Sequence, residues 1–123
     1  MPIIHEDEVA YNELPGRKHR MILTPESVGS KRMTFGTAVF PAHAVAPAHT
    51  HQAEEEIIYV LTGTGEIRFD GEPEPIRRGS CIFIPPGVEH QIAVDSDEPM
   101  EITYIFSPPT SPAAYDRPGG AAR

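Results

Sequence analysis

The hydrophobic positions of this chain fall into short runs that end at glycine or proline, a pattern typical of β-strands. The run at 57–61 is rich in β-branched and aromatic residues, and it stops at the sequence Thr-Gly-Thr-Gly at 62–65, a strong turn signal. A second run follows at 66–69. We therefore predict that these two runs pair as a hairpin.

Other short runs predict the remaining strands of an all-β fold. Strands are expected at 19–23, 33–40, 81–84, 90–94 and 100–106. The segment 70–75 contains turn residues and predicts a loop. The 14 prolines and 10 glycines argue against long helices. Short strands at close spacing, with turns between them, favour a β-sandwich or barrel over alternating strands and helices.

The length of the chain, 123 residues, suits one domain with one hydrophobic core. We predict an irregular N-terminal segment at 1–19, a β-domain at 20–106 and a proline- and glycine-rich tail at 107–123. The sequence shows no internal repeat, so we expect one β-domain and not two.

Three histidines and a run of glutamates stand at the starts of predicted strands. His49 and His51 are two residues apart on an extended segment, so their side chains should lie on the same face. The glutamates at 54–56 come just before the strand at 57–61, and His90 follows a Pro-Pro-Gly turn. Imidazole and carboxylate groups together are suitable ligands for a divalent transition metal.

Three histidines and one glutamate fill four coordination positions of such a metal. An octahedral ion then keeps two further positions for substrate, water or dioxygen, whereas a four-coordinate zinc keeps none. We therefore favour Fe2+, Mn2+ or Ni2+ as the cofactor, and Zn2+ or Cu2+ are the alternatives. The ligand types alone do not choose among the octahedral ions.

The two clusters resemble the two signature motifs of the cupin superfamily. The residues that match the first motif are His49, His51, Glu56 and Gly63. The residues that match the second motif are Gly79, Pro85, Gly87 and His90. The chain departs from the motifs at His43, where the family has glycine, and at Val94, where it has asparagine.

The resemblance implies a single-domain (monocupin) protein with the double-stranded β-helix, or jelly-roll barrel, of the cupins. It also implies that His49, His51, Glu56 and His90 bind the metal. Glu55 fits the shorter histidine-to-glutamate spacing of the first motif and is the alternative carboxylate. The remaining glutamates of the run are then expected to face solvent or to hydrogen-bond a histidine ligand.

Strand alternation predicts which side chains surround the metal. If Glu56 points inward, Ile58 and Val60 point inward too, and if His90 does so, Ile92 and Val94 follow. These positions predict a mostly aliphatic pocket that admits a small, partly apolar ligand. Tyr104, in the last predicted strand, is either a core aromatic residue or a proton donor in this pocket.

Composition excludes several classes of partner. The net charge of −8 makes a nucleic-acid partner improbable, and no segment is long and apolar enough to span a membrane. The N-terminus lacks the apolar core of a signal peptide, so a cytoplasmic location is expected.

Cys81, the single cysteine, lies between apolar residues and is predicted to be buried.

The function expected from the resemblance is that of a metal-dependent cupin enzyme. Among cupins with this ligand set, dioxygen-dependent oxidation of a small organic substrate is the most frequent chemistry, so a dioxygenase-type oxidoreductase is favoured. Isomerases, lyases and decarboxylases that use the metal as a Lewis acid are alternatives, and so is a non-catalytic module that binds a small ligand. The resemblance also implies a homodimer.

Overall fold

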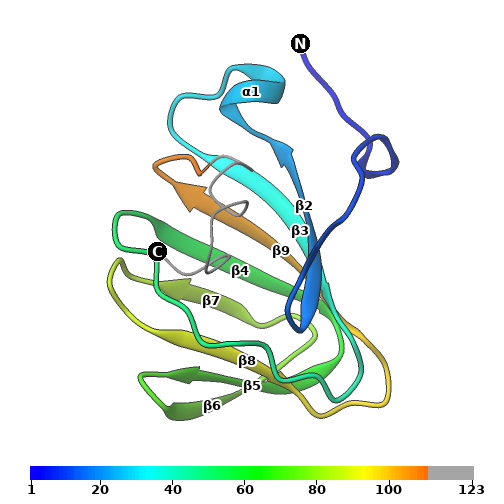
Figure 1. Ribbon diagram of the computed structural model, residues 1–123, viewed down its shortest axis with the longest axis vertical. Coiled ribbons are helices and arrows are strands. Elements are labelled where there is room, and N and C mark those ends of the chain that lie inside the picture. Colours follow the sequence, from blue (N-terminus) through cyan, green and yellow to red (C-terminus); the bar gives the residue numbers. More distant parts are fainter. Residues whose placement is uncertain (111–123) are drawn as a thin grey trace.

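The computed structural model describes residues 1–110, and these residues form two antiparallel β-sheets (Figure 1). The larger sheet has the strand order β1 (Asn12–Leu14), β2 (Arg17–Leu23), β3 (Thr34–Phe40), β9 (Met100–Ser107), β4 (Glu55–Thr62) and β7 (Cys81–Ile84). The smaller sheet has the order β6 (Glu72–Arg77), β5 (Thr64–Phe69) and β8 (His90–Val94). The all-β jelly-roll prediction is therefore confirmed.

The hydrophobic core lies between the two sheets, because strand alternation turns one face of each sheet inward. Along β3, for example, every second residue is buried. Ile58 of β4 and Ile102 of β9 contribute from the larger sheet, and Ile67 of β5 and Ile92 of β8 contribute from the smaller one. The five predicted strands at 19–23, 33–40, 81–84, 90–94 and 100–106 all correspond to strands of the structure.

The predicted hairpin between 57–61 and 66–69 is wrong. Its two strands exist as β4 and β5, but β4 pairs with β9 and β7, whereas β5 pairs with β6 and β8. The turn between them moves the chain from one sheet to the other. Gly63 makes this crossing possible, because its φ is +90° and a Cβ there would lie 2.8 Å from the Cα of Met100.

The predicted loop at 70–75 is also wrong, because most of it belongs to β6. Two prolines hid this strand. Pro73 and Pro75 pair with Arg68 and Glu66 of β5, and β6 lies at the edge of its sheet. An edge strand tolerates proline because the missing N–H can face away from the partner strand. Ile76, between the prolines and the next turn, is buried.

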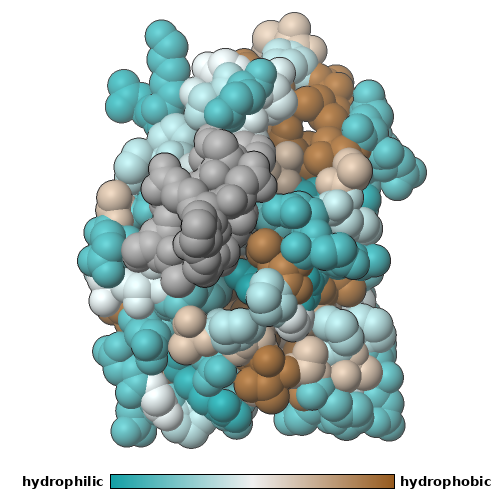
Figure 2. Space-filling model, in the orientation of Figure 1, coloured by the Kyte–Doolittle hydropathy of each residue, from teal (hydrophilic) through white to brown (hydrophobic). Residues whose placement is uncertain are grey.

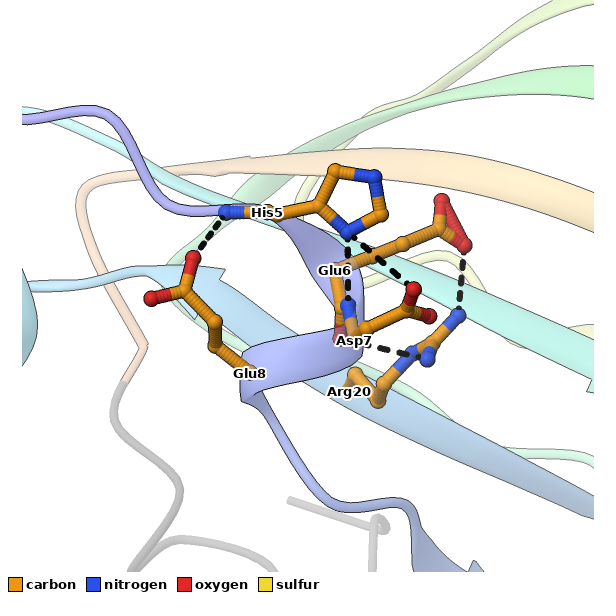
Figure 3. A network of polar contacts seen from close by, with 5 residues as sticks. All are labelled: His5, Glu6, Asp7, Glu8 and Arg20. Carbon is orange, nitrogen blue, oxygen red and sulfur yellow. Dashed lines mark hydrogen bonds and ion pairs between the residues drawn. The ribbon is translucent and has the colours of Figure 1, made fainter.

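The N-terminal segment 1–19 is more regular than its composition predicts. It contains a short 3-10 helix, η1 (Glu6–Glu8), the strand β1 and the start of β2. Figure 3 shows how Arg20 of β2 holds η1: its guanidinium donates to the Glu6 carboxylate at 2.7 Å and to the Glu6 carbonyl at 3.2 Å. Arg20 is only 8% exposed, whereas the Glu6 side chain is 51% exposed, so the arginine half of this ion pair alone is buried.

Two further features differ from the sequence-based predictions. Cys81 is exposed and not buried, because Ile82 and Ile84 of the short strand β7 take the inward positions. A single helical turn, α1 (Pro25–Val28), follows β2 and is capped by the Thr24 side chain. Most of the predicted tail at 107–123 lies outside the described residues.

One face of the molecule is largely polar and carries separate hydrophobic patches (Figure 2). Large apolar side chains that are exposed on the larger sheet include Ile57 and Tyr59 of β4 and Phe83 of β7. Among residues 1–110, no helix has the length and hydropathy needed to span a bilayer.

Substitution of alanine at Gly63 tests the sheet crossing. Gly63→Ala should lower the free energy of unfolding by more than about 2 kcal/mol, because it adds both a strained φ and a collision with the backbone of Met100. Gly71→Ala is the matched control: φ there is +88°, but a Cβ would meet nothing within 4 Å, so only the backbone cost of about 1 kcal/mol applies. Equal losses in urea unfolding would contradict this account of Gly63.

Candidate metal centre

Four side chains that can ligate a metal converge at one end of the core. His49, His51, Glu56 and His90 each offer one ligand atom, and these atoms all lie within 4.8 Å of one another. That spread is close to the roughly 4.2 Å between two ligands on opposite sides of an ion with bonds of about 2.1 Å. His49 is half-buried, and the other three side chains are buried. The donor set and its spacing therefore fit a divalent transition metal.

Backbone hydrogen bonds hold the two halves of this cluster together. His49 and His90 form an isolated antiparallel bridge in which each N–H donates to the other residue's carbonyl at 2.9 Å. The N–H of Gly87, in the Pro-Pro-Gly turn, donates to the carbonyl of His51 at 2.8 Å. Glu56 points inward from β4 by strand alternation. The turn residues of the second cluster thus position histidines of the first.

Two backbone carbonyls determine which nitrogen of each imidazole faces the cluster. His49 Nδ1 lies 3.3 Å from the carbonyl of Pro47, and His90 Nδ1 lies 3.1 Å from the carbonyl of Val88. A carbonyl can only accept, so each Nδ1 carries the proton and each Nε2 is left deprotonated. This is the tautomer that a metal-binding histidine needs.

The electrostatics of the cluster favour uncharged side chains. Burial raises the pKa of Glu56, although the neighbouring His90 opposes this effect. Burial and the adjacent His90 and His51 lower the pKa of His49 to about 2. Glu56 Oε1 and His90 Nε2 lie 3.3 Å apart, and within residues 1–110 neither atom has a hydrogen-bond partner. A bound cation would satisfy both atoms and stabilise the Glu56 carboxylate.

The glutamate run separates clearly in the structure. Glu56 is buried in the cluster, whereas Glu55 is exposed on the outer face of β4. Glu54 is buried and its carboxylate accepts a hydrogen bond from the Thr110 hydroxyl at 2.9 Å. The alternative that Glu55 takes part in the cluster therefore has no geometric support, and Glu54 has a partner outside it.

A small cavity of about 40 Å³ adjoins the cluster, which leaves room for a few water molecules. Its walls include His49, Glu56 and His90 on one side. The residues predicted from strand alternation that line it are Ile58, Ile92 and Tyr104. Val60 and Val94 do point inward, but they are buried in the core and do not line this cavity.

Two polar cavity residues, His19 and Arg17, have no motif in the sequence that could reveal them. His19 of β2 accompanies Tyr104 in the wall, with Nδ1 of His19 2.9 Å from the Tyr104 hydroxyl oxygen. Arg17 also lines the cavity and adds a positive charge to it. Arg17 and His19 are two residues apart, so strand alternation would put both side chains on one face of β2. The sequence-based prediction started this strand at residue 19 and therefore could not use this relation. The cavity is therefore more polar than predicted.

Comparison with known proteins agrees with this architecture. The family model for the cupin domain matches residues 36–106. Protein SchB of Streptomyces halstedii is 30% identical over 86% of this chain and 77% of its own length. The structure of a predicted oxalate decarboxylase from Thermotoga maritima superposes with a TM-score of 0.76 at 21% identity, covering 86% of this chain and 98% of the other. The polyketide cyclase RemF of Streptomyces resistomycificus has a TM-score of 0.74 at 24% identity, covering 94% and 92%.

The match over 36–106 includes both histidine clusters, all of β4 to β8 and most of β3 and β9. Two β-sheets with a three-histidine, one-glutamate cluster between them form a small β-barrel whose cluster could hold a metal ion. The chain belongs to the cupin family.

The cluster predicts that metal content depends on Glu56 and not on its neighbour. Glu56→Gln should weaken binding of Mn2+ or Ni2+ by roughly a hundredfold or more, because it removes a charged ligand. Glutamine has nearly the same size as glutamate and is uncharged, as burial favours at this position, so the metal-free protein should remain folded. Glu55→Gln, on the exposed face, is the control and should retain the metal. The metal content of both variants is measured after dialysis. The same metal-to-protein ratio in both would contradict the assignment of Glu56 as a ligand.

The buried His19 predicts how stability depends on pH in the metal-free protein. Burial, with a smaller effect of Arg17, lowers the pKa of His19 from 6.5 to about 4. The unfolded chain then binds a proton below pH 6.5 that the folded chain does not, so this contribution is present above pH 6.5 and is lost as the pH falls toward 4.

Urea unfolding at pH 7.5 and pH 5 checks this dependence. His19→Asn should lose less stability between the two pH values than the parent protein does. His43→Asn, at a side chain that is 61% exposed, should behave like the parent. A steeper or unchanged dependence in His19→Asn would show that His19 is not held neutral by burial.

Proposed function

We propose that this cupin is an enzyme in which a divalent metal, held by His49, His51, Glu56 and His90, activates a small oxygen-containing substrate. When bound, the metal would supply Lewis-acid polarisation of a substrate carbonyl or carboxylate oxygen. The observation that carries the proposal is that three members of the ligand cluster, His49, Glu56 and His90, line one small cavity together with hydrogen-bonding side chains.

The residues around the cavity are suited to binding and polarising a small anionic substrate. Ile58 and Ile92 exclude water from the ligand cluster and strengthen electrostatic interactions there. Arg17 adds a positive charge that would attract an anionic substrate to an otherwise acidic protein. Tyr104 and His19 provide a polar pair on the same cavity. Two structural neighbours are described as a predicted oxalate decarboxylase and a polyketide cyclase, so decarboxylation and ring closure are the reaction types to test first.

The experiment compares turnover with and without dioxygen. Protein loaded with Fe2+, Mn2+, Ni2+ or Zn2+ is incubated with small 2-oxo and 3-oxo acids, and the mixture is followed by proton NMR and an oxygen electrode. We expect at least one compound to be converted at the same rate in the absence of dioxygen. Glu56→Gln should abolish this conversion, and Glu55→Gln should preserve it.

The other outcomes identify the rival functions. Conversion that requires oxygen uptake would establish the dioxygenase-type oxidoreductase that the sequence resemblance favours. Compounds that bind to the metal-loaded protein and are recovered unchanged would establish a non-catalytic binding module. Either result would contradict the Lewis-acid proposal.

A homodimer and a cytoplasmic location also remain predictions for this chain. The outward-facing Ile57, Tyr59 and Phe83, which are 48%, 43% and 55% exposed, support self-association because burying them in an interface is favourable.

A further inference from the structure

The segment 44–49, which carries His49, lies beside β8 although it is not one of the regular strands (Figure 1). The Ala46 N–H donates to the carbonyl of Ile92 in β8 at 3.1 Å. His49 then pairs with His90, at the start of β8, in the antiparallel bridge described above. The position of His49 in the ligand cluster therefore depends on how firmly this segment is held.

The turn between β1 and β2 makes a close contact with the same segment. Gly16, in this turn, has a φ of +73°, and a Cβ at this residue would lie 2.9 Å from the Cα of Ala46 and 3.3 Å from the carbonyl oxygen of Val45. Carbon atoms that are not bonded to each other prefer a separation of about 3.5 to 4.0 Å. The turn can therefore approach the segment this closely only because residue 16 has no side chain.

A shift of Ala46 would be passed on to the metal ligand. Ala46 is only 2% exposed, so packed neighbours surround it and limit where it can move. The next residue, Pro47, provides the carbonyl that lies 3.3 Å from His49 Nδ1. Displacement of Ala46 would move this carbonyl and with it the ring of His49. Contacts of this kind orient the ligands of a metal and affect how tightly it is bound.

The turn and the segment also meet in the wall of the cavity. Leu14 and Arg17, at the two ends of the turn, line the cavity together with His49. Of the four residues of the ligand cluster, His49 alone is half-buried, and the others are buried. The contact at Gly16 thus adjoins the one ligand that solvent can reach.

We propose that the β1–β2 turn clamps the segment 44–49 against β8, and that Gly16 is the residue through which this clamp positions His49 for the metal. The inference rests on the metal centre of the proposed function but not on its reaction. A ligand that is already held in place loses less freedom when the ion binds, so the clamp raises the affinity for the metal. It also slows release of the ion, because His49 must move away from the cluster for the ion to leave.

Binding of Co2+ to two alanine variants tests the clamp. Gly16→Ala and Gly29→Ala both place alanine at a φ of +73°, but a Cβ at residue 29 would meet nothing within 4 Å. The backbone cost is therefore the same, and the collision with Ala46 is the difference. Gly16→Ala should weaken Co2+ binding roughly tenfold or more and speed its release to EDTA by a similar factor. Gly29→Ala should match the parent protein in both measurements.

A second pair of variants keeps the test valid if Gly16→Ala does not fold. Gly16→Asn and Gly29→Asn introduce a side chain that tolerates positive φ, so the collision remains while the backbone strain is smaller. Gly16→Asn should bind Co2+ more weakly than Gly29→Asn does. Equal affinities within either pair would overturn the proposal.

Hydrogen exchange without metal distinguishes the clamp from a merely structural role of Gly16. In metal-free Gly16→Ala, the Ala46 amide should exchange several times faster than in Gly29→Ala, because its hydrogen bond to Ile92 opens more often. The amide of Val60, which donates to the Ser80 carbonyl at 3.1 Å, should exchange equally in both variants. Equal exchange of the Ala46 amide, or faster exchange of both amides, would contradict the clamp.

The parent protein separates this inference from the proposed function. Failure of the parent to bind Co2+ would overturn the metal centre, and with it the role of Gly16 in metal binding. Binding of Co2+ by the parent, with equal affinity in Gly16→Ala and Gly29→Ala, would overturn this inference alone.

Discussion

The free-energy cost of burying three imidazoles and a carboxylate in one place is the constraint on which the architecture depends. A buried polar group without a partner destabilises the folded state, and a buried charge does so more strongly. The raised pKa of Glu56 and the lowered pKa of His49 express this cost. The protein offsets it by fixing the histidine tautomers with the carbonyls of Pro47 and Val88 and by joining the two clusters through the His49–His90 bridge. A cation bound by these four side chains would offset much of the remaining free-energy cost of burying them.

The chemistry of the cluster was largely predictable from the sequence, because it depends on local spacing. His49 and His51 share a face wherever the backbone is extended, and the Pro-Pro-Gly turn delivers His90 to the start of β8. Strand alternation likewise predicted the inward positions of Ile58 and Ile92. It also distinguishes Glu56 from Glu55 once the strand phase is known.

The features that the sequence did not reveal depend on pairing between distant segments. The β4–β5 turn has the composition of a hairpin. However, β4 is hydrogen-bonded to β9 on one edge and to β7 on the other, so β5 cannot pair with it and continues into the smaller sheet. The prolines of β6 are compatible with a strand only because that strand lies at a sheet edge. His19 and Tyr104 are 85 residues apart, and no local pattern connects them. Cys81 appeared buried because a four-residue apolar run does not show which of its faces is covered.

The position of β9 has a consequence for how the protein is made. β9, the last strand among residues 1–110, lies between β3 and β4, so the two parts of the larger sheet are joined only after residues 100–107 have been synthesised. Closing loops of this length carries an entropic cost and slows folding. Residues 49–90 can therefore be complete on the ribosome while Phe106, which packs against His51, has yet to emerge. A metal ion would then bind after β9 has paired with β3 and β4, and it would bind to the folded barrel and not to the growing chain.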